Sequence, residues 1–155
     1  MPASSVLVGL GNPMMSDDAA GLIVAAEVHR RLPGFDLELS TSDGLDIVDR
    51  ILNRDSAVII DSMVTGKHQP GTVVKLVLGR SLPTRRGSDA HTMGFGQAIE
   101  LARACGAAVP ARIVVYGIEV GDPHSVAECM SAALAERISA IADQIADDLQ
   151  SEQEG

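Results

Sequence analysis

The sequence predicts an α/β protein, a three-layer α/β/α sandwich around a mostly parallel central sheet of about five strands. Short apolar runs alternate along the chain with segments of helical periodicity, which is the order of elements expected of such a fold. Two of the runs, residues 56–63 and 111–120, are apolar at nearly every position, as in strands covered on both faces. The chain has 155 residues, 46% of them hydrophobic, which suits a single domain over residues 1–155 with its own core.

The first half of the chain contains five predicted elements. Residues 5–10, SVLVGL, are a short apolar run ended by glycine and predict a buried strand. Residues 17–32 have the spacing of a helix that ends at a Pro-Gly pair. Residues 36–41 alternate polar and apolar side chains, which is typical of a partly exposed strand. Residues 44–52 have helical spacing, and residues 56–63, SAVIIDSM, predict a strand covered on both faces.

The second half contains a turn and four more elements. Residues 67–71, KHQPG, form the turn, and residues 72–79 predict a strand that either pairs antiparallel with its predecessor or diverges from it. Residues 91–106 predict a helix that ends at a glycine, and residues 111–120 predict another strand covered on both faces. Residues 125–149 predict one long amphipathic helix, followed by an acidic tail that we expect to fray.

The charge of the chain argues against nucleic acid as a partner. The formal net charge is -9 and the pI is about 4.7, so the chain lacks the cationic footprint of a nucleic-acid binder. Aromatic residues make up only 2%, which leaves few platforms for stacked bases. The one basic cluster, residues 80–87, is interpreted as a solvated loop, with docking of a partner as the alternative.

The chain is expected to be a cytoplasmic monomer with no membrane partner. Its first residues lack the basic and apolar regions of a signal peptide, and no apolar run reaches about 18 residues. Cys105 and Cys129 have no Cys or His near them at metal-binding spacing, so both are predicted to be buried, reduced thiols.

The predicted topology gathers candidate ligands at one edge of the sheet. Sites in open α/β sheets form at the carboxyl ends of the strands. Asp18 follows the first strand, Asp61 ends the run AVIID, and His91 opens the helix after the basic cluster. Two carboxylates and an imidazole make a three-ligand site for a divalent transition metal, with positions left open.

Each of these residues also has a structural interpretation. Asp17 and Asp18 lie where helix caps and first-turn acids are common; a structural role is favoured for Asp17, and both roles stay open for Asp18. An acid at the end of a buried strand is costly unless it is paired or binds a ligand, although Asp61 could instead cap the loop after it. His91 could cap its helix, and the other histidines are interpreted as surface residues: His29, His68 and His124.

The glycines of the first turn, Gly9 and Gly11, do not make a dinucleotide-binding motif. In GLGNPM, Met14 stands where the third glycine of G-x-G-x-x-G belongs, and Asp17 and Asp18 would repel phosphate from the helix start. The glycines instead allow a sharp turn that exposes the backbone to a bound peptide or ion.

The sequence resembles two known families, one through its first turn alone and one over most of its length. VGLGNP resembles the start of peptidyl-tRNA hydrolases, which carry a catalytic histidine soon after the motif, whereas here no histidine precedes His29. We interpret that likeness as a shared turn. A broader resemblance, over residues 6–146, is to the maturation endopeptidases of nickel–iron hydrogenases, through GLGNPMMSDDAAG, VIIDSMVTGKHQPGTVVKL and SDAHTMGFGQAIELA.

The resemblance to the maturation endopeptidases implies an activity and a set of site residues. The activity is removal of the C-terminal extension of a hydrogenase large-subunit precursor after nickel insertion. The nickel, supplied by the precursor, would be recognised by Asp18, Asp61 and His91, which are the implied catalytic and metal-binding residues. Other divalent metals would be able to occupy the same site. The implied substrate-binding residues are Gly9, Gly11, Asn12, Asp43 and Gly44.

Two positions depart from the family pattern, and other functions stay open. Ala19 stands where a glycine often follows the acidic pair, and the family's Asp-Gly-Gly-Thr segment is represented only by Asp43 and Gly44. The sequence also lacks H-E-x-x-H and any trusted Ser-His-Asp order. The alternatives are a metal-sensing binding protein or chaperone that does not cleave, and a peptidyl-tRNA hydrolase-like esterase.

Overall fold

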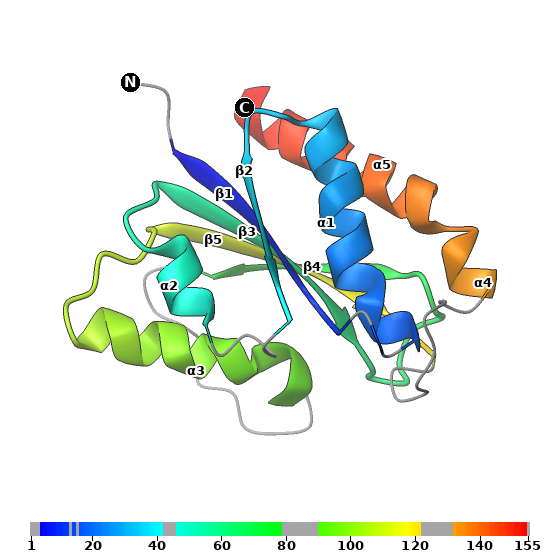
Figure 1. Cartoon of the computed structure of the whole chain (residues 1–155), viewed down its shortest axis with the longest axis horizontal. Coiled ribbons are helices and arrows are strands. Elements are labelled where there is room, and N and C mark those ends of the chain that lie inside the picture. Colours follow the sequence, from blue (N-terminus) through cyan, green and yellow to red (C-terminus); the bar gives the residue numbers. More distant parts are fainter. Residues whose placement is uncertain are drawn as a thin grey trace.

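The computed structural model describes residues 4–12, 14, 16–41, 46–78, 90–121 and 132–154. One sheet lies between two layers of helices, with α1, α4 and α5 on one face and α2 and α3 on the other (Figure 1). The predicted three-layer sandwich is thus confirmed.

The sheet has five strands in the order β2-β1-β3-β5-β4. All neighbours pair in parallel except β4, which runs antiparallel to β5. Of the two arrangements left open for the strand after the KHQPG turn, divergence is therefore the observed one, because β5 lies between β3 and β4. Every residue of β5 after the first is buried, which suits an inner strand, whereas β4 is largely exposed. The strands are β1 (Ser5–Leu10), β2 (Asp36–Ser40), β3 (Ser56–Met63), β4 (Val73–Leu78) and β5 (Arg112–Glu119).

The helices agree with the expected elements, with three differences. The first helix begins with a 3-10 turn, and the helix expected over residues 44–52 is described only as a short one, ending before Asn53, whose φ is 63°. The long C-terminal helix is divided, in the part of it that is described, at Glu136 and Arg137. The elements are η1 (Ser16–Ala19), α1 (Ala20–Arg31), α2 (Ile47–Ile51), α3 (Ala90–Ala104), α4 (Ala132–Ala135) and α5 (Ile138–Glu154).

The acidic tail does not fray as expected, because α5 continues through it to Glu154. Glu152 forms ion pairs with Lys75 of β4 and, at 2.8 Å, with Arg112 of β5. These two cations hold the last turns of α5 against the sheet, where sequence alone shows only an excess of acids.

Two apolar cores fill the space between the sheet and its helix layers. In β1, Leu7 packs on the α1–α5 side, and its neighbours Val6 and Val8 pack on the α2–α3 side, as alternation along a strand requires. The same alternation holds in β3 and β5. The chain's three aromatic residues are all buried in these cores: Phe35, Phe95 and Tyr116.

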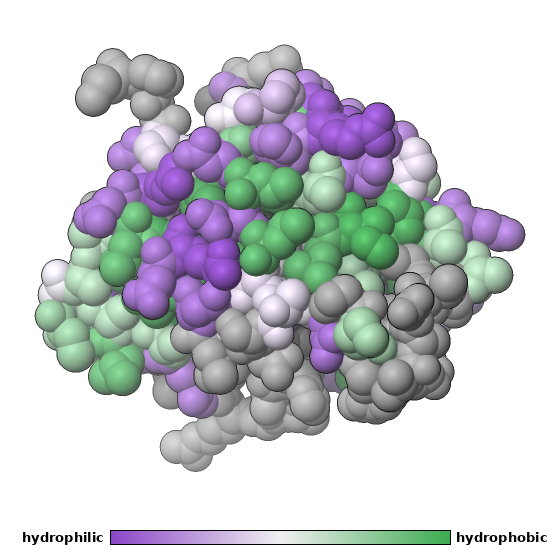
Figure 2. Space-filling view, viewed as in Figure 1, coloured by the Kyte–Doolittle hydropathy of each residue, from purple (hydrophilic) through white to green (hydrophobic). Residues whose placement is uncertain are grey.

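Not all apolar side chains are covered. Figure 2 shows hydrophobic residues gathered across the middle of one face, over β2 and α1. Two of the large exposed apolar side chains come from these elements, Leu39 of β2 and Ile23 of α1, exposed by 44% and 42%. Some exposed apolar surface is ordinary for a folded chain.

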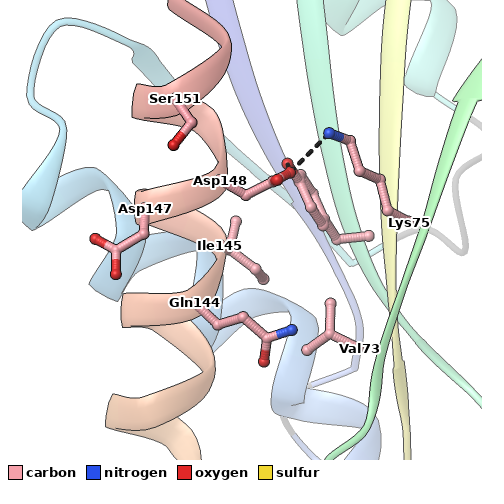
Figure 3. A pocket seen from close by; sticks show the side chains of 8 residues that line it. Val73, Lys75, Gln144, Ile145, Asp147, Asp148 and Ser151 are labelled. Atoms are coloured by element: carbon pink, nitrogen blue, oxygen red, sulfur yellow. Dashed lines mark hydrogen bonds and ion pairs between the residues drawn. The ribbon is translucent and has the colours of Figure 1, made fainter.

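A polar cluster fastens α5 to the sheet beside a cavity of about 330 Å³ between β4 and α5 (Figure 3). The hydroxyl of Tyr116 donates to Asp148 Oδ2 at 2.6 Å, and Lys75 Nζ lies 2.7 Å from the same oxygen. Hydrogen bonds from Lys75 and Tyr116 hold the pKa of Asp148 below its usual value, and burial raises the pKa of Tyr116 well above its own. Two of the charged groups that line the cavity, Lys75 and Asp148, thus pair with each other.

The contacts of Asp148 predict how stability responds to acid. Because its pKa is lowered by folding, the carboxylate stabilises the fold above its unfolded pKa of about 3.9, and this contribution is lost as the pH falls through the lowered folded value. Asp148→Asn should therefore cost about 1 kcal/mol at neutral pH and should weaken the loss of stability in acid. Thermal melts across the acid range measure both effects. Asp147→Asn, an exposed neighbour, is the control and should change stability by less than about 0.5 kcal/mol.

Candidate functional site

The candidate site lies at the edge of the sheet where the parallel strands end. The chain leaves β1 through Gly11 and Asn12, enters η1, and returns over the sheet as α1 (Figure 1). Gly11 N donates to the carbonyl of Ser40 at the end of β2 (3.2 Å), so this turn lies directly on the edge.

Asp18 connects the first turn to β3. Its Oδ2 accepts a hydrogen bond from Asn12 N at 3.1 Å, and its Oδ1 accepts one from Ser62 Oγ at 2.8 Å. The N-cap of α1 is Ala19, with no side-chain cap bond. In the structure, Asp18 therefore binds back to the turn and across to β3, and it is not the cap of α1.

Close packing of backbone on backbone fixes this arrangement. A Cβ atom on Gly11 would lie 2.2 Å from the carbonyl oxygen of Asp18, and one on Gly21 would lie 2.1 Å from that of Leu10. The same atom on Gly21 would lie 3.1 Å from the Cα of Asp61. Only glycine permits these approaches, and they bring the start of α1 against the ends of both β1 and β3.

Asp61 lies near the end of β3, whose bounds are those of the strand predicted over residues 56–63, and two more residues follow it in the strand. Its side chain is partly buried, and its Oδ1 accepts a hydrogen bond from Ser62 N at 2.8 Å. By strand alternation Asp61 faces the α2–α3 layer, and Ser62, which binds Asp18, faces the α1 layer. Asp18 and Asp61 therefore flank the end of the same strand, one on each side.

His91 is the second residue of α3, and its side chain lies outside the described residues. The far end of α3 lies at the opposite edge of the sheet, because Asn53 N, just before β3, donates to the carbonyl of Ala108 at 2.9 Å. The helix has 15 residues, a length of about 22 Å, so it begins on the same side of the molecule as Asp18 and Asp61 (Figure 1). Its role as the third ligand stays a prediction.

The other predicted site residues fall into two groups. Gly9 is buried within β1 against Ala25, and Asn12 Oδ1 accepts a hydrogen bond from Met14 N at 2.9 Å. Asp43 and Gly44 lie outside the described residues. A substrate-binding role for all of these, and for Gly11, stays a prediction.

Asp17 differs from its neighbour in being almost fully buried. It is 1% exposed within η1 and has an interaction partner, as a buried carboxylate requires. This burial agrees with the structural role favoured for Asp17, although neither acid caps α1.

Sequence reasoning missed two polar residues at this edge, Ser62 and Glu119. Ser62 supplies the hydroxyl that orients Asp18. Glu119, at the end of β5, is 2% exposed and accepts hydrogen bonds from the loop after β3. The signal for Glu119 was present in the run ARIVVYGIEV, since an acid at the end of a buried strand needs a partner here as much as Asp61 does.

The carboxylates at this edge are the donors that a divalent metal in a mixed oxygen and imidazole site requires. Each oxygen of Asp18 accepts one hydrogen bond and keeps a further lone pair for a ligand. Among the described side chains, which exclude that of His91, no three His, Cys, Asp or Glu residues form a group that could hold a metal ion. Of the three predicted ligands, the described side chains include Asp18 and Asp61, and their role as ligands stays a prediction.

The prediction of buried thiols is wrong for Cys105. This residue follows the end of α3, where it is exposed and free, because the last turn of the helix extends past the core. Cys129 lies outside the described residues. None of the described helices is both long enough and apolar enough to span a membrane.

A family model and a known protein sequence that match this chain point to the same family. A model of the hydrogenase maturation protease family matches residues 41–148. The hydrogenase 2 maturation protease of Escherichia coli strain K12 is 25% identical over 127 residues, which are 77% of this chain and 76% of that protein.

Solved structures of similar proteins have the same fold. The hydrogenase maturating endopeptidase HybD from E. coli superposes with a TM-score of 0.73 at 21% identity, covering 96% of this chain and 93% of that one. The [NiFe] hydrogenase maturation protease HybD from Thermococcus kodakarensis gives 0.67 at 24% identity, covering 94% and 98%.

The glycine contacts make a prediction about the site. Gly11→Ala places a methyl group against the Asp18 backbone, so the start of η1 must shift, at a cost of about 1–3 kcal/mol. The shift should break the hydrogen bonds of Asp18 to Asn12 and Ser62. Gly34→Ala is the matched control, because a Cβ there meets nothing within 4 Å. Denaturant unfolding should show a large loss of stability for the first variant only; equal stability of the two would contradict the close approach.

Proposed function

The chain belongs to the hydrogenase maturation protease family, and from this premise we propose that it removes the C-terminal extension of a nickel–iron hydrogenase large-subunit precursor after nickel insertion. The reaction is hydrolysis of one peptide bond: water is added across the C–N bond, giving a new carboxylate on the mature subunit and a free amine on the released peptide. We expect it to act in the cytoplasm, as a monomer.

The observation that carries this proposal is the hydrogen bond between Ser62 and Asp18. It joins the connection after β1 to the end of β3, so that Asp18 and Asp61 flank one strand end. Two carboxylates at the end of one strand favour a cation beside them, because its charge stabilises the ionised form of both. The nickel of the precursor is the cation that the proposed reaction brings to this edge.

Asp18 is oriented for such a contact before the substrate arrives. The Asn12 N–H and the Ser62 hydroxyl occupy one lone pair on each of its oxygens. This leaves further lone pairs on a carboxylate that cannot rotate without losing both bonds. We propose that Asp18, Asp61 and His91 bind the nickel of the precursor and thereby place the scissile bond at the sheet edge.

Two uses of the bound nickel fit the same ligands. The metal would polarise the scissile carbonyl or activate the attacking water, or it would serve only to recognise and position a loaded precursor. In both cases the protease distinguishes precursors with nickel from those without it.

The direct test is incubation of the purified protein with a large-subunit precursor in nickel-loaded and nickel-free forms. Mass spectrometry should show loss of the C-terminal extension from the loaded form alone. Binding of the loaded form without cleavage would support the alternative of a metal-sensing binding protein. Cleavage of both forms at equal rates would contradict nickel recognition.

Aspartate variants test the assignment of roles. Asp18→Asn and Asp61→Asn keep the size of each side chain but remove the charge that attracts a cation, so cleavage should fall by at least about 100-fold, as when catalytic electrostatic groups are removed. Asp17→Asn should lose stability, because the residue is buried, but should keep cleavage well below its melting temperature. Cleavage rates and thermal melts are measured side by side for all three. Normal cleavage by Asp61→Asn, or a defect confined to Asp17→Asn, would overturn the assignment.

A further inference from the structure

The carboxylate of Glu119 holds the loop that follows β3. Thr65 N donates to Oε2 at 2.9 Å and Gly66 N to the same oxygen at 3.4 Å, and the Thr65 hydroxyl donates to Oε1. Both oxygens of this buried side chain are thus used by two consecutive loop residues. The hydrogen bonds from Thr65 and Gly66 account for how this buried carboxylate is satisfied.

The backbone of Glu119 holds the other end of the same loop. Gly71 N donates to its carbonyl oxygen at 2.8 Å, and its own N–H donates to the carbonyl of Thr72 at 2.9 Å. One residue therefore fastens the loop, residues 64–71, at both ends. A chain of eight residues closed in this way loses most of its conformational freedom.

Further contacts brace the loop from within and from outside. The Thr65 hydroxyl oxygen accepts a hydrogen bond from Lys67 N at 3.1 Å, which tightens the turn after it. On the other side, the Arg137 side chain occupies the space beside Gly71, whose φ is 95°; a Cβ there would lie 2.5 Å from Arg137 Nε. The loop is thus shaped by polar contacts rather than by core packing.

The fastened loop lies beside the candidate site. Met63 and Glu119 are partners in the β3–β5 register, and Asp61 lies two residues before Met63 on the same face of the sheet. Val120 N donates to the carbonyl of Met63 at 2.9 Å, so the strand is held up to the point at which the loop begins. Loop and carboxylates therefore share the carboxyl edge.

The burial of Glu119 is costly for a loop that adds little to the core. A carboxylate at a 2% exposed position loses its hydration, and only hydrogen bonds compensate. What those bonds hold is mostly exposed: Val64 is 50% exposed, and Lys67 and His68 are exposed as well. An apolar residue would suit the end of β5 equally well if stability were the only requirement.

We propose that Glu119 is a positioning residue, and that the loop it fastens, residues 64–71, is a preformed wall that binds the precursor polypeptide beside the cleaved bond. This inference rests on the proposed function. Its chemistry is that of a surface for an extended peptide: an exposed apolar side chain at Val64 and basic side chains at Lys67 and His68, in a chain whose net charge is -9. A loop already ordered binds without the entropy cost of ordering it.

The test compares Glu119→Gln with Glu152→Gln. Glutamine keeps the volume of Glu119 but replaces one acceptor oxygen by an amide NH2 group, which donates hydrogen bonds and cannot accept one from Thr65. Glu152→Gln is the matched control, because it weakens ion pairs to Lys75 and Arg112 at the opposite edge of the sheet. Each variant is measured with the nickel-loaded precursor well below its melting temperature.

Two readouts are expected to change together in Glu119→Gln. The KM for the precursor should rise about tenfold, equivalent to about 1.4 kcal/mol, with kcat within about twofold of wild type. Hydrogen exchange at the Thr65 and Gly66 amides should accelerate, while the Val120 amide stays protected. Glu152→Gln should keep the wild-type KM and the wild-type exchange of the loop.

The outcomes separate this inference from the proposed function. A released loop with an unchanged KM, or equal KM changes in both variants, would overturn the loop as a binding wall. If Glu119→Gln fails to fold, Thr65→Val carries the same comparison: it removes both bonds of the hydroxyl, to Glu119 and from Lys67 N, and keeps the bond from Thr65 N to Glu119. Absence of cleavage by the wild-type protein would refute the proposed function, whereas exchange at Thr65 and Gly66 would still test the fastening by Glu119.

Discussion

The close approach of α1 to the ends of β1 and β3 is the constraint on which the candidate site depends. A Cβ atom at Gly11 or Gly21 would clash with a carbonyl oxygen, at 2.2 Å and 2.1 Å respectively. This backbone contact brings Asp18 within reach of Ser62. Any residue with a side chain at these glycines would move the helix outward and separate the two carboxylates of the edge.

The same edge gathers acids in a chain that is already strongly acidic. Asp18, Asp61 and Glu119 are each supplied with donors from nearby N–H groups, and two of them also accept from hydroxyls. These bonds fix the orientation of each carboxylate. The edge therefore holds three ordered acids, an arrangement that favours a cation bound by few protein ligands.

Most of the fold, but only part of the site, could be predicted from sequence. Alternation of apolar runs and helical segments predicted the sandwich, and the rule that sites lie at strand ends placed Asp18 and Asp61 at one edge. Periodicity says nothing of which strands are neighbours, so the position of β5 between β3 and β4 was not predictable. Glu119 was overlooked because its partners, in the loop after β3, are 54 residues away in sequence. Equally, the ion pairs that keep α5 helical to Glu154 connect distant segments.

The contact between Arg137 and Gly71 has a consequence for the order in which the chain is made. A ribosome releases all five strands before it releases residue 137, so the sheet and Glu119 are available while α5 is still being synthesised. Until Arg137 arrives beside Gly71, the loop after β3 lacks one of its braces. A nascent chain thus has the carboxylates of the edge before it has the fully braced loop beside them, and the turn between α4 and α5, which carries Arg137, completes the shape of the connection after β3.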